Sequence, residues 1–436
     1  MNYRYTEKEY VEKDKKYVFH SWGFSPLVQA EGKGCILKDI NGKEYIDCLS
    51  QMAGPAGVGI SHPKVVMAVK DQVEKLACGM AWCVNIPRVE LAEKLAKITP
   101  PGMTKFFFAT TGGESDEFAL KTAMKITRKK EVISVYLAYH GATIALLSLG
   151  HPWHRVGMPT VPGFRQIPAP YCYRCSYGKS YPDCDLECAK ALEDMIQFGT
   201  YHDVAAFIME PILGMGGHIL PPKEYFKIIR EICDRYGVLF ITDEIQTGFG
   251  RTGKIWAIEH YDVVPDIMVI GKAMGGGVPI SAAVFKENIV IPELEEDPYH
   301  VYTNQGNPLS CAAASAVVDI VVDEDIPGKA EKMGKFWYEH LKELEERHPL
   351  IGDIRGKGLY IGVELVKDRK TKEKAPQEAL RVIQECQKRR VLFALSNKPG
   401  VGNVIKIKPP MVITEELSSR ALEVFNEALG VVEKQM

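Results

Sequence analysis

Two residues that could do chemistry together follow two short apolar stretches of this chain. Residues 238–242 (VLFIT) run into Asp243, and residues 267–270 (IMVI) are followed after one glycine by Lys272. Both stretches have the length and β-branched content of parallel strands that are covered on both faces. Ligands of open α/β sheets bind beyond the carboxyl ends of such strands, so we expect Asp243 and Lys272 to meet in one crevice.

The glycines of residues 248–254 partly match two nucleotide-binding motifs. A P-loop requires Ser or Thr after its lysine to hold magnesium, whereas this chain has Ile255. A dinucleotide fingerprint requires a strand that runs straight into the glycines, but residues 243–247 intervene. We therefore reject a nucleotide site in this stretch.

A lysine and an aspartate at neighbouring strand ends suit pyridoxal phosphate. The lysine amine can form a Schiff base with the aldehyde of the cofactor. An acid beside the pyridine nitrogen keeps that nitrogen protonated, so that the ring can accept electrons. The local pattern leaves one alternative open, in which Lys272 is a surface lysine and Asp243 caps a helix.

A second stretch has the pattern of a phosphate site. The predicted strand from Lys105 to Thr111 runs into Gly112, Gly113 and a predicted helix from about Ser115 to Thr127. Small residues at such a turn allow backbone amides to face an anion at the positive end of the helix. A plain turn is the alternative.

Four cysteines have the spacing C-x2-C-x8-C-x3-C, namely Cys172, Cys175, Cys184 and Cys188. Four thiols within 17 residues could bind a tetrahedral zinc ion. Unligated thiols and a disulfide are the alternatives. Because the chemistry above does not need this loop, and because cysteine is often a small buried hydrophobe, we predict no metal here.

The strand-end stretches resemble the class III aminotransferases, the ω-aminotransferase group of fold-type I pyridoxal phosphate enzymes. DEIQTGFGRTG at residues 243–253, followed by PDIMVIGKAMGGGVPISA at residues 265–282, is similar to the signature of this family. The similarity continues across nearly the whole chain. It implies that Lys272 carries the cofactor, that Asp243 contacts the pyridine nitrogen, and that Gln246 lies near the phenolic oxygen.

The resemblance also implies roles outside these stretches. Gly112 and Gly113 are expected to bind the phosphate, Tyr139 to stack on the cofactor ring, and Glu210 to lie close to the cofactor. Thr303, within YTNQGNPL, is expected to reach the phosphate of the cofactor in a neighbouring subunit. A homodimer with shared active sites follows from that role.

Several positions concern the substrate or depart from the family pattern. Asp116 stands at a position where the family usually has asparagine, and Ala142 where several members have arginine. Lys406 replaces an arginine that binds carboxylates, and a lysine is a point charge without the planar fork. Lys406 is therefore either a substrate residue or a solvated strand residue. Trp82 lies in a loop near the substrate entrance of the family, and either lines a pocket or belongs to the core.

The composition is that of an ordinary soluble protein. Of the 436 residues, 46% are hydrophobic and 25% are charged, and the net charge of -2 gives no electrostatic reason to expect nucleic acid or membrane partners. No apolar run approaches the length of a membrane span, and the charged N-terminus lacks the core of a signal peptide. We expect a cytoplasmic protein whose eleven cysteines are mostly free.

The strand and helix patterns predict an α/β fold, and the resemblance implies that it is of the fold-type I class. A large domain with a mainly parallel central sheet wrapped by helices is expected at residues 61–325, and a small α+β domain at 326–436. Residues 1–60 are expected to form an arm and strands that pack with the small domain. They include a hairpin at Asn41-Gly42 with a type I′ turn.

The predicted activity is amino transfer from an ω-amino acid or amine to pyruvate or 2-oxoglutarate by a ping-pong mechanism. Lys272, once released from the cofactor, is the expected base. The departures at Ala142 and Lys406 keep an alternative open. It is an enzyme of the same fold and cofactor that acts as an amino-acid racemase or epimerase, an aminomutase, or an ammonia- or phospho-lyase.

Overall fold

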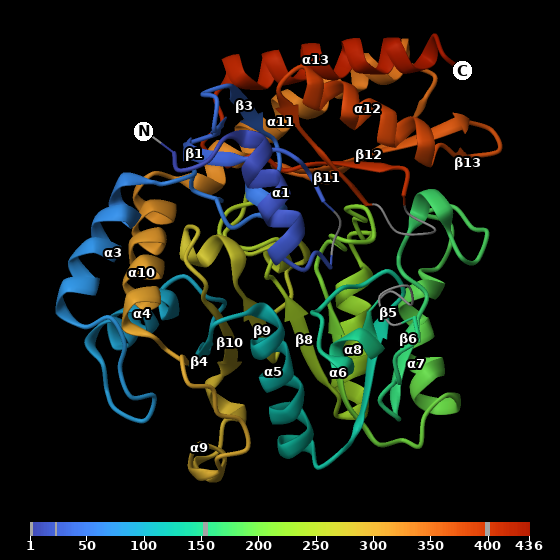
Figure 1. Cartoon of the computed structure of the whole chain (residues 1–436). Coiled ribbons are helices and arrows are strands. Elements are labelled where there is room, and N and C mark those ends of the chain that lie inside the picture. The colour runs from blue at the N-terminus through green and yellow to red at the C-terminus, as the bar shows by residue number, and fades with distance from the viewer. Residues whose placement is uncertain (1–2, 22–23, 151–155, 397–401) are drawn as a thin grey trace.

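A seven-stranded sheet in the order β4-β10-β9-β8-β7-β5-β6 forms the centre of the computed structural model, which describes residues 3–21, 24–150, 156–396 and 402–436 (Figure 1). Strand β10 is antiparallel to both of its neighbours, and the remaining pairs are parallel. The expected mainly parallel sheet is confirmed. Its strands are β4 (Met103–Ala109), β5 (Glu131–Val135), β6 (Phe164–Ile167), β7 (Val204–Met209), β8 (Leu239–Asp243), β9 (Ile267–Ile270) and β10 (Ser281–Lys286).

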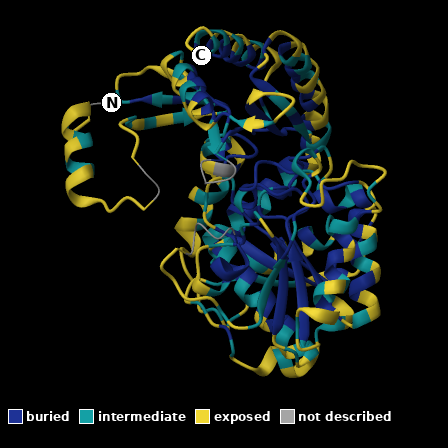
Figure 2. Cartoon of the chain, turned by 90° about the vertical axis from the view of Figure 1, so that its right-hand side faces the viewer, coloured by how far each residue is buried: buried dark blue, intermediate teal, exposed yellow. Residues whose placement is uncertain are grey.

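The central strands are apolar on both faces because helices cover both faces. Ile241 of β8 and Val269 of β9 pack with α5 (Gly112–Thr127) and α6 (Ile144–Leu149). The alternate residues, such as Phe240, belong to the larger core cluster that includes α7 (Glu187–Phe198) and α8 (Tyr225–Tyr236). Figure 2 shows these strands as the buried centre of the molecule. The other long helices beside this sheet are α3 (Pro63–Lys75), α4 (Ile86–Ala96) and α10 (Pro308–Asp323).

Two smaller sheets lie at one end of the central sheet, beneath α11 (Ile326–Arg347), α12 (Pro376–Lys388) and α13 (Glu415–Glu433) (Figure 1). One sheet has the order β1-β2-β3-β14, and the other has the order β11-β12-β16-β15 with β13 paired to β12. Their strands are β1 (Gln29–Lys33), β2 (Ile36–Asp39), β3 (Glu44–Asp47), β11 (Ile351–Lys357), β12 (Tyr360–Asp368), β13 (Glu373–Lys374), β14 (Val391–Leu392), β15 (Ala394–Ser396) and β16 (Val404–Ile407). Strand β14 pairs with β3, so N-terminal strands share a sheet with a strand near the C-terminus. The domain boundaries at residues 60 and 325 stay a prediction.

The hairpin between β2 and β3 is present, but its predicted type I′ turn is wrong. Gly42 has φ 77°, whereas Asn41 is not among the residues with positive φ, and a type I′ turn requires both. The carboxylate of Asp39 accepts hydrogen bonds from the amides of Asn41 and Lys43, both at 2.9 Å. This side chain holds the turn in another form.

The N-terminal helix α1 (Glu7–Tyr17) stands away from the rest of the chain (Figure 2). It has no buried residue, although Thr6 and Glu9 form a complete capping box at its start. Among the described residues, no helix has the length and apolar character needed to cross a membrane.

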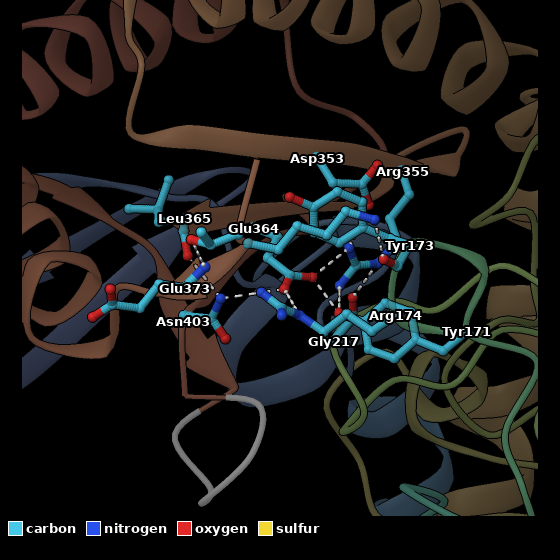
Figure 3. A network of polar contacts seen from close by, with 12 residues as sticks. Tyr171, Tyr173, Arg174, Gly217, Asp353, Arg355, Glu364, Leu365, Glu373 and Asn403 are labelled. Atoms are coloured by element: carbon cyan, nitrogen blue, oxygen red, sulfur yellow. Dashed lines mark hydrogen bonds and ion pairs between the residues drawn. The ribbon is translucent and has the colours of Figure 1, made fainter. Parts of the chain in front are cut away.

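A buried ionic network connects the loop before α7 to the C-terminal sheet (Figure 3). Glu364 of β12 is completely buried and accepts hydrogen bonds from Arg174 at 2.5 Å, Arg355 at 2.8 Å and Asn403 at 3.2 Å. It also accepts one from the hydroxyl of Tyr171. One carboxylate therefore joins segments that are far apart in the sequence.

We expect Glu364→Gln to lower the free energy of unfolding by about 3 kcal/mol, because Arg174 loses its carboxylate partner and, among the described residues, Arg355 keeps only Asp353. Glu373→Gln is the matched control. Glu373 forms an exposed pair with Lys367 at 2.7 Å, and its loss is expected to cost less than about 1 kcal/mol. Chemical denaturation measures both values. Equal effects of the two substitutions would contradict the structural role of the network.

Candidate active site

A cavity of about 1140 Å³ opens beyond the carboxyl ends of β7, β8 and β9. Most of the residues that the sequence predicts to be functional line this cavity. They are Gly112, Gly113, Tyr139, Glu210, Asp243, Gln246, Lys272 and Lys406. The crevice expected at the strand ends is therefore present.

Lys272 follows β9 and begins the short helix η4 (Lys272–Gly275). Its φ of 46° lies in the left-handed region, which is unfavourable for a residue with a side chain and is often found at functional sites. Burial lowers the pKa of its amine, while Asp243, Glu210 and Asp116 act in the opposite direction. A cavity amine with a lowered pKa is more readily available as a nucleophile than an ordinary surface lysine.

Asp243 ends β8 and is 3% exposed. Its Oδ2 lies 2.8 Å from Nδ1 of His140, and its Oδ1 accepts a hydrogen bond from the amide of Ile245 at 3.0 Å. Nε2 of His140 lies 3.1 Å from the hydroxyl of Ser134. The carboxylate is thus fixed at the cavity wall. Our sequence reasoning gave His140 no role, although its place just beyond β5 was a usable signal.

The N-terminus of α5 faces the same cavity. This helix begins at Gly112, three residues before the predicted start, and its cap is Thr111, which forms a capping box with Glu114. The first amides of a helix have no partner within the helix, so those of Gly112 and Gly113 are suited to an anion. A Cβ on Gly112 would lie only 2.5 Å from Cδ1 of Ile245. A side chain at this position would crowd the wall, which explains the glycine.

Glu210 connects the loop that carries Tyr139 to the end of β7. Its carboxylate accepts hydrogen bonds from the amide of Tyr139 at 3.0 Å and from the amide of Gly214 at 2.9 Å. Burial, together with the charge of Asp243, raises the pKa of Glu210 to about 7, while His140 opposes this shift. Glu210 is therefore held in place, and its pKa lies above the usual range of a carboxyl group.

Two buried lysines, one in β16 and one directly after it, line one side of the cavity. Lys406 is 6% exposed and Lys408 is 2% exposed, so the solvated alternative for Lys406 is wrong. The ammonium of Lys408 and the hydroxyl of Tyr360 each donate to Oε1 of Gln246 at 3.1 Å. Burial and the charges of Lys406 and Lys272 lower the pKa of Lys408 well below its usual value. In the sequence, only the alternation of lysine and isoleucine at residues 406–408 indicated that Lys408 could belong to the site.

Thr303 and Trp82 do not line this cavity of their own chain. Thr303 is exposed, and the side chain of Trp82 is 82% exposed, so the core alternative for Trp82 is wrong. The predicted contact of Thr303 with a cofactor phosphate requires a second subunit. The predicted place of Trp82 near a substrate entrance is compatible with one. Both roles stay predictions.

The four clustered cysteines line one small cavity of about 20 Å³ between the short helix η2 (Cys172–Arg174) and the start of α7. All four thiols are free. Among the described residues, three or more metal-ligating atoms lie within 4.8 Å of one another only at Asp116, His140 and Asp243, so the thiols do not form such a group. Metal analysis of protein purified without added metal tests the zinc alternative.

The glycine stretch that imitated a nucleotide site has another role. A Cβ on Gly250 would lie 3.1 Å from the backbone nitrogen of Pro327, and a Cβ on Gly253 would lie 3.1 Å from Cβ of Glu331. Both glycines thus allow this loop to pack closely against the start of α11. This packing supports the rejection of a phosphate loop here.

Comparison with known proteins identifies a family and individual proteins that are similar to this chain. The family model for class III aminotransferases matches residues 20–429. A leucine/methionine racemase of Thermococcus litoralis is 38% identical, over 94% of this chain and 92% of that protein. An isoleucine 2-epimerase of Lentilactobacillus buchneri is 34% identical, over 97% and 94%. An acetylornithine aminotransferase of Methanothermobacter thermautotrophicus is also 34% identical, over 97% and 99%.

Solved structures agree with these sequence matches. An aminotransferase of Bacillus anthracis superposes with a TM-score of 0.92 at 32% identity, covering 97% of this chain and 98% of that one. An ω-transaminase of Pseudomonas jessenii in complex with PMP also has a TM-score of 0.92, at 29% identity and 98% coverage of both chains.

Proposed function

The chain belongs to the class III aminotransferase family, and from this premise we propose that it transfers the amino group of an ω-amino acid or amine to pyruvate or 2-oxoglutarate in a ping-pong reaction. One observation carries the proposal. Lys272 and Asp243 face a single cavity from the ends of the neighbouring strands β9 and β8. A nucleophilic amine and a fixed carboxylate are thereby available to one small molecule.

Pyridoxal phosphate is the cofactor of this family, and the residues present fit it. When bound, it supplies an aldehyde that exchanges amines and a pyridine ring that accepts electrons from the substrate. The amides of Gly112 and Gly113 would hold its phosphate at the positive end of α5. Asp243 would accept the hydrogen bond of its ring nitrogen, and Tyr139 would cover its ring.

The side chains of this chain then have separate tasks. Nζ of Lys272 would move the proton between the substrate carbon that bears the nitrogen and the cofactor, and its lowered pKa favours this role. Asp243 keeps a negative charge at the ring nitrogen, because His140 and the amide of Ile245 hold its carboxylate. Lys406 offers a positive charge to a substrate carboxylate.

The proposal includes a homodimer in which the two subunits share their active sites. Thr303 would reach the phosphate in the second subunit, and Trp82 would stand near the entrance of a substrate pocket. Both side chains are exposed in the single chain, which leaves them accessible for these roles. We place the enzyme in the cytoplasm.

Racemisation or epimerisation of an amino acid is the second candidate. The racemase at 38% identity and the epimerase at 34% favour it, and it begins with the same proton removal. Among the described residues that line the cavity, the cationic side chains are lysines and none is arginine. These described residues therefore do not provide the bidentate hydrogen bonds with which an arginine binds a carboxylate.

A single-turnover experiment separates the two candidates. The holoenzyme is mixed with an amino donor but no 2-oxo acid, and the absorbance of the cofactor is followed. Transamination predicts stoichiometric conversion to the amine form of the cofactor, which pyruvate then reverses. Racemisation predicts no such conversion, together with deuterium entering L-leucine from heavy water while the D-enantiomer accumulates. That second pattern would replace the first candidate by the second.

A further inference from the structure

Asp116 has a completely buried carboxyl group. It lies in α5, and neither of its carboxyl oxygens has a partner among the described residues. An ionised carboxylate at such a place lacks the donors that normally offset lost hydration. The protonated form avoids most of this cost because it carries no net charge.

The surroundings make a second negative charge still more costly. An oxygen of Asp116, an oxygen of Asp243 and a ring nitrogen of His140 all lie within 4.8 Å of one another. Burial, followed by the charge of Asp243, raises the pKa of Asp116 well above the usual value, and Lys272 acts in the opposite direction. The charged or titratable groups that face it are Asp243 on β8, His140 after β5, Lys272 after β9, Glu210 after β7 and Glu117 on α5 itself.

We propose that Asp116 keeps its proton in the folded enzyme and acts as a neutral acid that positions the carboxylate of Asp243. The two carboxyl groups then carry one negative charge between them. This charge stays on Asp243, where His140 and the amide of Ile245 hold it. A neutral aspartic acid has nearly the shape of asparagine and can donate a hydrogen bond as asparagine does. The acid can therefore stand where the family usually has the amide.

The catalytic consequence of this inference rests on the proposed function, because it requires the cofactor nitrogen to meet Asp243. The protonation itself does not rest on it. Infrared difference spectroscopy of the holoenzyme at neutral pH measures the protonation directly. The wild-type spectrum minus that of Asp116→Asn is expected to contain the C=O band of a carboxylic acid. A difference with carboxylate bands alone would overturn the proposal. Asp71→Asn, at an exposed position of α3, is the control and is expected to give no carboxylic-acid band.

The pH dependence of unfolding gives a second measurement. An unfolded aspartate loses its proton near pH 3.8, whereas folded Asp116 keeps it to higher pH. The wild type therefore loses stability as pH rises from that value towards the folded pKa of Asp116, and Asp116→Asn lacks this loss. The difference in unfolding midpoint between the two holoenzymes should grow in favour of the variant between about pH 5 and the folded pKa. A difference that stays constant over this range would contradict a retained proton.

Two variants test the positioning role. Asp116→Asn keeps a donor towards Asp243, and we expect kcat within about threefold of the wild type. Asp116→Leu has similar branching but no donor, and we expect kcat to fall about tenfold with KM nearly unchanged. Equal kcat values would show that the donor does not matter. If transamination itself proves wrong, the infrared result is unaffected, so the two failures are distinguishable.

Discussion

Lys272→Ala is expected to lower kcat on the order of 10⁴-fold, the largest effect of any single substitution in this chain. The variant loses both the amine that holds the cofactor and the base that moves the substrate proton. Asp243 and the N-terminus of α5 are unchanged, so it should still bind pyridoxal phosphate without a covalent bond. Single-turnover kinetics with a saturating amino donor measure the loss.

Lys254→Ala is the matched control for this substitution. Lys254 is exposed and ends the glycine stretch that imitates a phosphate loop. It donates to the backbone carbonyl of Glu259 at 3.0 Å and lies outside the cavity wall. We expect its kcat to stay within about twofold of the wild type. A large loss here, or a small loss in Lys272→Ala, would mean that the wrong lysine has been assigned.

Asp243→Asn is expected to lower kcat about 10³-fold. The amide has the same shape as the carboxylate but no charge, so it no longer favours a proton on the ring nitrogen. His140 also loses its charged partner at 2.8 Å. Absorbance titration of the holoenzyme should show that the cofactor ring loses its proton at a lower pH than in the wild type.

Asp262→Asn serves as the control for that variant. Asp262 is exposed and has φ 54°, a conformation that asparagine tolerates. Its activity and cofactor spectrum should match those of the wild type. If Asp243→Asn behaved in the same way, Asp243 would not be the partner of the ring nitrogen.

Sequence reasoning placed residues well where a strand end determines their position. Val269 and Asp243 pair across β9 and β8, so the residues after both strands reach one cavity, and parallel pairing makes this predictable. The helix at Gly112 follows from the same geometry.

Contacts between distant segments were harder to predict. Lys408, which directly follows β16 of another sheet, reaches Gln246, and His140 meets Asp243 only because β5 and β8 both flank β7. The periodicity of apolar residues within one helix or strand does not indicate such contacts. Trp82 is exposed in this chain, and its predicted place near a substrate entrance stays a prediction. At Asn41, the side chain of Asp39 overrode the turn type that the local sequence favours.

The lysine that carries the cofactor can be identified directly, because three lysines line the cavity. Lys272, Lys406 and Lys408 all line its wall. Borohydride reduction of the holoenzyme makes a bond between lysine and cofactor permanent, and peptide mass spectrometry then locates it. We expect one stoichiometric modification, at Lys272. Modification at Lys406 or Lys408, with Lys272 unmodified, would contradict it.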